Sequence, residues 1–455
     1  MTTLPPPITR DPNPEPWRKA LHAFYGLLWW VAIGLGSPWW LGRSLYDPAF
    51  RRMVRERLGF GLPQPPGPGG RRRVLIHGVS VGEVKAAQAL VASLEEECPE
   101  LELWFSTVTD TGVAVATELY GAERVVRFPV EPGAIVRRFL RRLQPEAIVL
   151  VELEIWPNFL RAANQLGIPV AVVNGRITER SFRSYQRFKN LLPQFNRISL
   201  YCVQGSEYGD RFLELGVAPE RVVLTGNVKA DSLGDGPVEP GEELRRLLGG
   251  RPGQQVLTAG STHEDEELQV ALAWREGVPG ARLLLVPRHP QRAADIERAL
   301  RLEGLEPQRL TALRAGEAPD PGRPALVDTI GELERVYGLS DLVFVGGTLV
   351  PHGGQNMLEP AAQGRPVLHG PHVDNFLVEA RLLGEAGGSL TVADSAELGR
   401  LLAQLAQDAD RRDRMARAGL EVVARQRGAT GRTLRALRER CLEPLAGAWN
   451  GREPL

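Results

Sequence analysis

Short apolar strands alternate with helical segments over most of the chain, and this alternation constrains the fold more than any other feature. The first series of predicted strands comprises residues 74–76, 101–105, 147–150, 170–173, 200–203 and 222–224. A second series comprises residues 256–259, 283–286, 325–327, 342–345, 366–369 and 390–392. Strands that alternate with helices predict parallel sheets covered by helices on both faces.

The segment 234–242 separates the two series, because Gly, Pro and acidic residues cluster there as in an interdomain linker. A chain of 455 residues also exceeds the size of one ordinary core. We therefore predict an α/β protein with two Rossmann-like, doubly wound domains facing a cleft, at 71–233 and 252–455, behind an N-terminal anchor helix in residues 1–60. A return of the C-terminal helices to the first domain is an open alternative.

An uncharged segment near the N-terminus predicts membrane attachment. Residues 21–41 contain no acid, Lys or Arg, and the run is about as long as a hydrocarbon core of roughly 30 Å requires. Arginines follow at once, so the positive-inside rule predicts that the body of the protein lies on the cytoplasmic side of the membrane. Pro38 and several glycines weaken a spanning helix, and a helix that lies in the membrane surface is the alternative.

Charge and cysteine content exclude other classes. Lys plus Arg equals Asp plus Glu, 55 against 55, so bulk charge gives no argument for a nucleic-acid partner. The three cysteines form neither a CxxC pair nor a Cys/His cluster, which argues for a reducing compartment without a zinc site. The segment 262–266 contains a His and three acids, but it lies at a predicted helix start, where acids commonly cap helices. We predict no metal.

The turn after the first strand, His77-Gly-Val-Ser-Val-Gly-Glu83, carries a candidate general base. The carboxyl ends of parallel strands are where ligands bind, and Glu83 begins the helix there. A glutamate at that position also complements a helix dipole. The same turn matches the GxSxG nucleophile elbow, so a hydrolase with Ser80 as nucleophile is an alternative.

Two further turns of the first domain carry candidate residues. Glu152 and Glu154 leave a buried strand beside Trp-Pro-Asn, and strand alternation predicts that both point to the same side. Lys229, in Thr225-Gly-Asn-Val-Lys-Ala-Asp231, supplies the cation that a departing phosphate needs. The alternative for Lys229 is a solvated surface lysine.

Two turns of the second domain predict an anion site. Arg288 and His289 end a strand between prolines, and a guanidinium suits phosphate oxygens. The Gly-rich loop 346–354 leads into a helix whose backbone amides favour an anion, and Glu359 is placed to accept hydrogen bonds from a ribose. The spacing fits neither the Walker A motif nor the dinucleotide fingerprint, which disfavours a kinase or a dehydrogenase.

Seven ordered motifs together resemble the family of 3-deoxy-D-manno-octulosonic acid (Kdo) transferases. They are Ser80-Val-Gly-Glu83, Glu152-Leu-Glu154-Ile-Trp-Pro-Asn158, Gly226-Asn-Val-Lys229, Gly260-Ser-Thr-His263, Pro287-Arg-His-Pro290, Asp328-Thr-Ile-Gly-Glu332 and Gly346-Gly-Thr-Leu with Asn356-Met-Leu-Glu359-Pro. The resemblance spans residues 74–376. It implies a GT-B fold and an inverting, metal-independent transfer of Kdo from CMP-Kdo to a lipid A precursor in lipopolysaccharide core biosynthesis, without a cofactor.

The resemblance also implies roles for individual residues. Glu83 is the catalytic base, and Glu154 and Lys229 support the transition state. The expected CMP-binding residues are Arg288, His289, Gly331, Glu332, Leu333, Asn356, Met357, Leu358 and Glu359. The chain departs from the family at Gln355 and Met357, where His and Pro are usual, and in a lengthened segment 308–323. The nearer alternatives are a GT-B enzyme that uses a UDP-sugar and an epimerase on the same fold.

Overall fold

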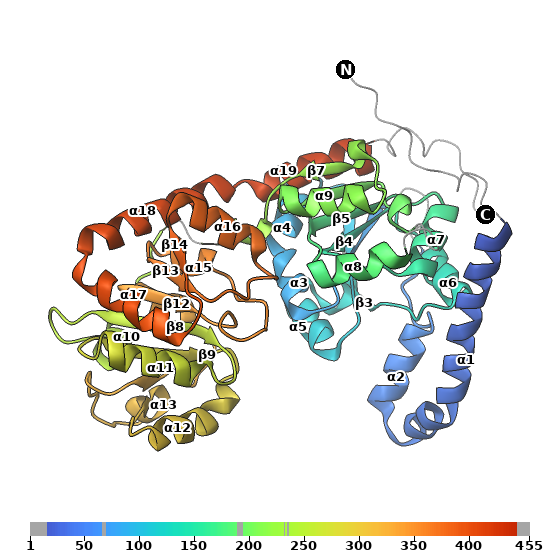
Figure 1. Ribbon diagram of the computed structural model, residues 1–455. Coiled ribbons are helices and arrows are strands. Elements are labelled where there is room, and N and C mark those ends of the chain that lie inside the picture. Colours follow the sequence, from blue (N-terminus) through green and yellow to red (C-terminus); the bar gives the residue numbers. More distant parts are fainter. Residues whose placement is uncertain (1–15, 66–69, 189–193, 232, 234–235, 444–455) are drawn as a thin grey trace. The chain divides into compact units, whose positions relative to one another are not determined.

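Two seven-stranded parallel sheets organise the part of the chain that the computed structural model describes, residues 16–65, 70–188, 194–231, 233 and 236–443 (Figure 1). The chain divides into a first unit, Met1–Asp231 with Gly428–Leu455, and a second unit, Ser232–Arg427. The predicted two-sheet α/β fold is confirmed. Residues 234–235 of the predicted interdomain linker lie outside the described residues.

The first sheet has the strand order β3-β2-β1-β4-β5-β6-β7. Its strands are β1 (Arg72–His77), β2 (Leu101–Thr107), β3 (Val125–Arg127), β4 (Ala147–Val151), β5 (Val170–Gly175), β6 (Leu200–Val203) and β7 (Val222–Leu224). The helices between them are α3 (Val81–Ala86), α4 (Gln88–Glu97), α5 (Asp110–Tyr120), α6 (Gly133–Leu143), α7 (Pro157–Gln165), α8 (Glu179–Phe188) and α9 (Ser206–Glu214), and the 3-10 turn η4 (Val228–Ala230) follows β7.

The second sheet has the order β10-β11-β9-β8-β12-β13-β14. Its strands are β8 (Val256–Thr262), β9 (Arg282–Pro287), β10 (Gln308–Arg309), β11 (Ala325–Leu326), β12 (Leu342–Val345), β13 (Val367–His369) and β14 (Ser389–Thr391). Its helices are α10 (Glu242–Leu248), α11 (Glu266–Gly277), α12 (Ala293–Leu302), α13 (Leu310–Arg314), α14 (Leu333–Leu339), α15 (Leu358–Ala362), α16 (Leu377–Ala386), α17 (Ser395–Gln407) and α18 (Ala409–Gln426).

Each sheet reverses its strand order beside its first strand. The reversal falls between β1 and β4 in the first unit and between β8 and β12 in the second. Loops that leave neighbouring strands at such a switch point diverge to opposite faces and leave room for a ligand at the carboxyl ends. The residues that follow β1, β4, β8 and β12 are therefore candidates for binding and catalysis.

The last helix, α19 (Ala429–Leu437), packs in the core of the first unit. Leu434 and Leu437 belong to the apolar cluster that holds Val74 and Ile76 of β1. The carboxylate of Asp231 accepts hydrogen bonds from the backbone amides of Gly428 and Thr430, both at 2.6 Å, where α19 begins. The helix α19 therefore packs against the first sheet and belongs to the core of the first unit.

A helical hairpin precedes the first sheet. It consists of α1 (Pro16–Tyr46) and α2 (Pro48–Arg57), which lie side by side (Figure 1). Asp47 caps α2 by accepting a hydrogen bond from the amide of Phe50 at 3.0 Å. Within the described residues, one helix is long and apolar enough to cross a membrane, at Ala20–Tyr46 with a mean hydropathy of 1.3, and 6% of its apolar window is buried.

The packing of α19 predicts the effect of a truncated side chain. Leu434 is 2% exposed, so Leu434→Ala should destabilise the first unit by about 2–5 kcal/mol through lost burial and a cavity. Leu420, on α18, is 37% exposed, and Leu420→Ala should change stability by no more than about 0.5 kcal/mol. Urea unfolding followed by fluorescence measures both. Equal effects would contradict the assignment of α19 to this core.

Candidate active site

Glu83 is fixed by a reciprocal cap at the start of α3. Ser80 is the N-cap residue, and its hydroxyl donates to Glu83 Oε1 at 2.8 Å while the amide of Val79 donates to Oε2 at 2.7 Å. This Ser-x-x-Glu pattern is a capping box. A Cβ on Gly78 would lie 3.1 Å from the Cβ of Glu83, so the glycine permits this close approach. Burial raises the pKa of Glu83, and the charge of Glu152 adds to this.

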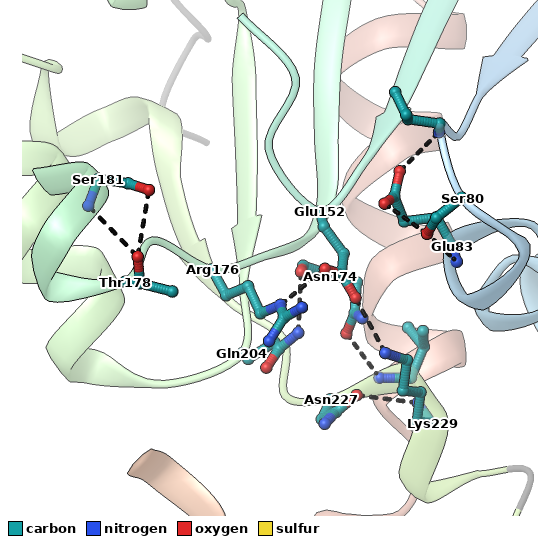
Figure 2. Close-up of polar contacts among 12 residues, drawn as sticks. Ser80, Glu83, Glu152, Asn174, Arg176, Thr178, Ser181, Gln204, Asn227 and Lys229 are labelled. Carbon is teal, nitrogen blue, oxygen red and sulfur yellow. Dashed lines mark hydrogen bonds and ion pairs between the residues drawn. The ribbon is translucent and has the colours of Figure 1, made fainter. Parts of the chain in front are cut away.

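Glu152 lies between two cations at the carboxyl end of β4 (Figure 2). Its carboxylate accepts from Arg176 Nε at 2.6 Å and from Lys229 Nζ at 2.9 Å. Burial alone would raise the pKa of Glu152, but the charges of Lys229 and Arg176 outweigh this effect and lower it. Glu152 is therefore an ionised, paired carboxylate that ties the ends of β4, β5 and the turn η4 together.

Glu154 has the opposite electrostatic character. Burial and the nearby negative charge of Glu83 raise its pKa to about 7. Two carboxylates that interact in this way resist simultaneous ionisation, so the pair holds a proton near neutral pH. At the switch point of the first sheet lie one paired acid, Glu152, and two acids with raised pKa values, Glu83 and Glu154.

The prediction that alternation places Glu152 and Glu154 on the same side of a strand is wrong. β4 ends at Val151, and Glu152 has φ of 64°, in the left-handed region. The two-residue period of a strand therefore does not extend to these glutamates. Glu152 pairs with Lys229 and Arg176, while Glu154 is coupled electrostatically to Glu83 and, to a smaller extent, to Glu152.

Three amide side chains outside the predicted set form hydrogen bonds at this site (Figure 2). Asn174 Oδ1 accepts from the amide of Val228 at 3.1 Å, and Asn227 Oδ1 accepts from the amide of Lys229 at 3.0 Å. Gln204 Nε2 donates to the carbonyl of Asn174 at 3.0 Å. Asn174 lies near the end of the strand β5, and Arg176, Gln204 and Asn227 follow β5, β6 and β7, so their place at the carboxyl ends of strands is the sequence signal that could have found them.

In the second unit, a buried glutamate holds the predicted Gly-rich loop. Glu266 is fully buried at the start of α11, and its carboxylate accepts from the amides of Gly347, Thr348 and Leu349 at 2.5, 2.8 and 2.9 Å. It also accepts from the amide of His263 at 3.0 Å. Because this carboxylate consumes the loop amides, they are directed at Glu266 rather than at a ligand. The described residues contain no group of three His, Cys, Asp or Glu side chains suited to a metal.

Three histidines gather beside that loop. The ring of His263 stacks on His352, with centroids 4.2 Å apart, and meets His289 edge-on at 5.9 Å. Gln355 Nε2 lies 3.1 Å from His263 Nε2. Burial lowers the pKa of His263 to about 4, and the charges of His352, His289 and Arg288 contribute. Arg288 and His289 are both exposed, so they can reach a ligand.

The remaining predicted nucleotide residues differ in accessibility. Gly331 has φ of 88°, and the buried Glu332 accepts from Arg314 at 2.7 Å and from Arg335 at 3.2 Å. Leu333 begins α14 and is half-buried.

The segment 356–359 begins α15. Asn356 Oδ1 accepts from the amide of Leu358, and its Nδ2 donates to Glu359 Oε1, both at 3.1 Å. Met357 and Leu358 are at most 1% exposed, so these two residues can offer a ligand only their backbone groups.

The structure therefore gathers the predicted residues at two places. Glu83, Glu154 and Lys229 lie at the switch point of the first sheet or beside it. Arg288 and His289 follow β9, the segment 331–333 follows β11, and the segment 356–359 follows β12, all in the second sheet. The roles predicted for these residues stay predictions.

Known proteins share both the fold and the sequence. A family model described as 3-Deoxy-D-manno-octulosonic-acid transferase (kdotransferase) matches residues 52–232. The chain is 35% identical over 405 residues to a 3-deoxy-D-manno-octulosonic acid transferase of Haemophilus influenzae, covering 87% of this chain and 93% of that protein. It is 33% identical over 444 residues to one of Bordetella pertussis, covering 92% and 97%.

The crystal structure of Anabaena Alr3699/HepE in complex with UDP matches the fold with a TM-score of 0.58, at 13% identity, over 83% of this chain and 100% of that chain. The paired parallel sheets and this likeness define a GT-B-type fold. The sequence relatives are more specific, because the chain spans nearly their whole length. The chain belongs to the 3-deoxy-D-manno-octulosonic acid transferase family and is a glycosyltransferase.

The ion pairs of Glu152 predict how stability depends on pH. The folded-state pKa of Glu152 lies below its ordinary value of 4.5, so its stabilisation is present above about pH 4.5 and is lost as pH falls through the folded pKa. Glu152→Gln should lower stability at pH 7 by about 1.5–3 kcal/mol, the contribution of hydrogen bonds to charged groups. The variant should also lose less stability than the wild type on acidification.

Thermal unfolding from pH 7 to pH 3 measures this dependence. Glu118→Gln, at an exposed position of α5, is the matched control and should follow the wild type. If Glu152→Gln and the wild type lost stability in parallel, the carboxylate would not be the ionised partner of the two cations.

Proposed function

We propose that the enzyme transfers Kdo from CMP-Kdo to a lipid A precursor in lipopolysaccharide core biosynthesis, with inversion and without a metal. The observation that carries this proposal is the pair of glutamates with raised pKa values, Glu83 and Glu154, beside the Glu152–Lys229 ion pair. Membership of the Kdo transferase family supports Kdo as the transferred sugar. CMP-Kdo as donor and the lipid A precursor as acceptor are parts of the proposal.

Glu83 is the proposed general base. A sugar hydroxyl is a poor nucleophile near neutral pH, so a carboxylate must accept its proton as the new bond forms. Burial raises the pKa of Glu83 toward the working pH, which strengthens it as a base. The capping hydrogen bonds from Val79 and Ser80 fix its orientation. Burial and the negative charge of Glu83 raise the pKa of the neighbouring Glu154 to about 7.

The leaving group requires positive charge. CMP departs as an anion, and without a metal the compensation falls to cationic side chains and helix N-termini. Lys229 has its ammonium positioned by Glu152 at 2.9 Å, and the exposed Arg288 and His289 offer charge and hydrogen-bond donors for the phosphate. Glu359 and the backbone at 357–358 are the proposed contacts to the rest of the nucleotide.

The N-terminal hairpin is the proposed link to the inner membrane, with the catalytic units on its cytoplasmic side. The candidate span Ala20–Tyr46 is mostly exposed, and exposed arginines at 51, 52 and 55 follow it in the sequence. A lipid-linked acceptor lies at the membrane surface, so tethering raises its effective concentration near the enzyme.

The serine hydrolase alternative lacks support. The hydroxyl of Ser80 donates to Glu83 and caps α3, which explains the GxSxG match by helix geometry. A UDP-sugar donor is a stronger alternative than a hydrolase, since the crystal structure of HepE, which shares this fold, is a complex with UDP. Thermal shifts with CMP and with UDP distinguish the two donors. Mass analysis of the product formed from CMP-Kdo and a lipid A precursor tests the reaction itself.

Glu83→Gln should lower turnover by about 10²- to 10⁴-fold, because the amide keeps the shape but cannot accept the proton. CMP affinity should be unchanged, because Glu83 belongs to the acceptor side in the first unit. The measurement is kcat for Kdo transfer together with calorimetry of CMP binding. Glu96→Gln, at an exposed position of α4, is the matched control.

Ser80→Ala is the companion variant. It removes one cap and one hydrogen bond to Glu83, and it should retain substantial transfer because the base is still present. A Glu83→Gln enzyme that transfers Kdo at near the wild-type rate would reduce Glu83 to a capping residue.

Arg288→Ala and Glu359→Ala should each weaken CMP binding about tenfold to a hundredfold, since a charge-assisted contact contributes roughly 1.5–3 kcal/mol. Calorimetry with CMP measures the affinity. Arg298→Ala on α12 is the matched control, because Arg298 is 73% exposed and pairs with Asp295 on its own helix. Wild-type affinity in both variants would place the nucleotide elsewhere than at the loops after β9 and β12.

A further inference from the structure

The first half of α1 is bound to the body of the first unit. His22 is 5% exposed, and its Nε2 lies 3.2 Å from Nη2 of Arg197. Tyr25 lies near Glu131 and lowers the pKa of this carboxylate against the larger effect of burial. Glu131 is buried and accepts from the amides of Asn158 at 2.9 Å and Phe159 at 3.2 Å at the start of α7. These polar contacts keep the beginning of α1 against the protein.

The far end of α1 is held by α2. The hairpin tip is closed by Asp47, and the rings of Trp39 and Phe50 meet edge-on with centroids 5.6 Å apart. From the tip, the 10 residues of α2 return to the body. There the carbonyl of Arg57 accepts from the amide of Val130 at 3.0 Å, and Glu56 pairs with Arg127 at 3.1 Å.

The length of α2 limits how far the hairpin projects. A helix rises 1.5 Å per residue, so α2 carries the tip about 15 Å from its attachment at Arg57. A hydrocarbon core is about 30 Å thick. The first half of α1 is bound to the body, and α2 holds the tip within half the thickness of a bilayer. While these contacts persist, α1 cannot cross the membrane.

The surface of the hairpin is apolar along α1, whereas α2 is an amphipathic, arginine-rich helix of the interfacial kind. The exposed large apolar side chains of α1 are Phe24, Leu27, Leu28, Trp30, Val31, Leu35, Trp39, Leu41, Leu45 and Tyr46. Exposed arginines at 43, 51, 52 and 55 accompany them at the tip and along α2. Helices with apolar and Lys/Arg-rich faces lie in the membrane surface, with the apolar face about 5–10 Å deep.

The base of the hairpin offers further cationic groups. A cavity of about 370 Å³ lies between α1, α6 and α7, and Arg137 and Arg161 line it together with Leu27 and Trp30. Guanidinium groups beside apolar side chains suit the phosphate and first methylenes of a lipid. The charge of the whole surface is therefore complementary to an anionic leaflet.

We propose that α1 and α2 form an in-plane hairpin that enters a single, anionic leaflet, with the N-terminus of the chain on the same side of the membrane as both catalytic units. The inference rests on the membrane attachment proposed above and is independent of the reaction. A spanning α1 would place the N-terminus on the opposite side, and this difference can be measured.

Labelling of single cysteines tests the topology. Cys98, Cys202 and Cys441 are buried, so the full-length protein has a low background. Thr3→Cys reports the N-terminus, and Asp413→Cys, at an exposed position of α18, reports the catalytic side. A membrane-impermeant maleimide is applied to spheroplasts before and after permeabilisation. We expect both cysteines of the membrane-bound protein to react only after permeabilisation.

Labelling of Thr3→Cys in intact spheroplasts, with Asp413→Cys protected, would overturn the in-plane hairpin and leave attachment intact. Recovery of the full-length protein in the soluble fraction would overturn attachment itself. Activity measured on the same membranes reports the transferase separately, so a failure of the proposed reaction cannot be mistaken for a failure of the topology.

Vesicle binding tests the anionic leaflet. Replacing Arg51, Arg52 and Arg55 by Gln should weaken binding to phosphatidylglycerol vesicles by about fivefold per arginine, with little change on phosphatidylcholine vesicles. The matched control replaces the exposed Arg414, Arg417 and Arg425 of α18 by Gln. Equal loss in both triple variants, or no loss in the hairpin variant, would overturn the proposed contact.

Discussion

A buried glutamate at the switch point of each sheet holds the loops that carry the candidate chemistry. Glu152, 8% exposed, joins Lys229 and Arg176 in the first unit, and the fully buried Glu266 binds the amides of the loop after β12 in the second. A buried carboxylate without partners costs several kcal/mol. Each buried glutamate therefore needs the donors of its loop, and each loop is held in place by its glutamate. These contacts also fix the positions of the exposed groups nearby.

The three acids at the first switch point owe their different characters to their partners. Glu152 has two cations and a lowered pKa, whereas Glu154 has the negative charge of Glu83 nearby and a pKa raised to about 7. Glu83 has neutral donors only, from Val79 and Ser80, and burial raises its pKa. A base needs a pKa near the working pH. Glu83 and Glu154, which are not paired with cations in the way that Glu152 is, therefore suit proton transfer, whereas Glu152 suits the positioning of Lys229 and Arg176.

Strand–helix alternation predicted both sheets because their central strands are continuous apolar runs. The short edge strands β3 and β10 were missed, since Val125–Arg127 and Gln308–Arg309 are too brief and too polar for a pattern. The positive φ of Glu152 is a backbone property that no spacing reveals. The acid-rich start of α11 predicted a cap, but only the fold shows that Glu266 binds the amides of Gly347, Thr348 and Leu349, which are 81, 82 and 83 residues away in the sequence.

The membrane hairpin and the loop of Glu154 share a structural element. Glu131 lies near Tyr25 of α1 and accepts from the amides of Asn158 and Phe159 in the first turn of α7, which follows Glu154 closely in the sequence. The amides at a helix start need acceptors, and a buried carboxylate needs donors. Displacing α1 would remove Tyr25 from the vicinity of Glu131 and so alter the surroundings of the carboxylate that caps α7. The hairpin is therefore part of the packing beside the loop that carries Glu154.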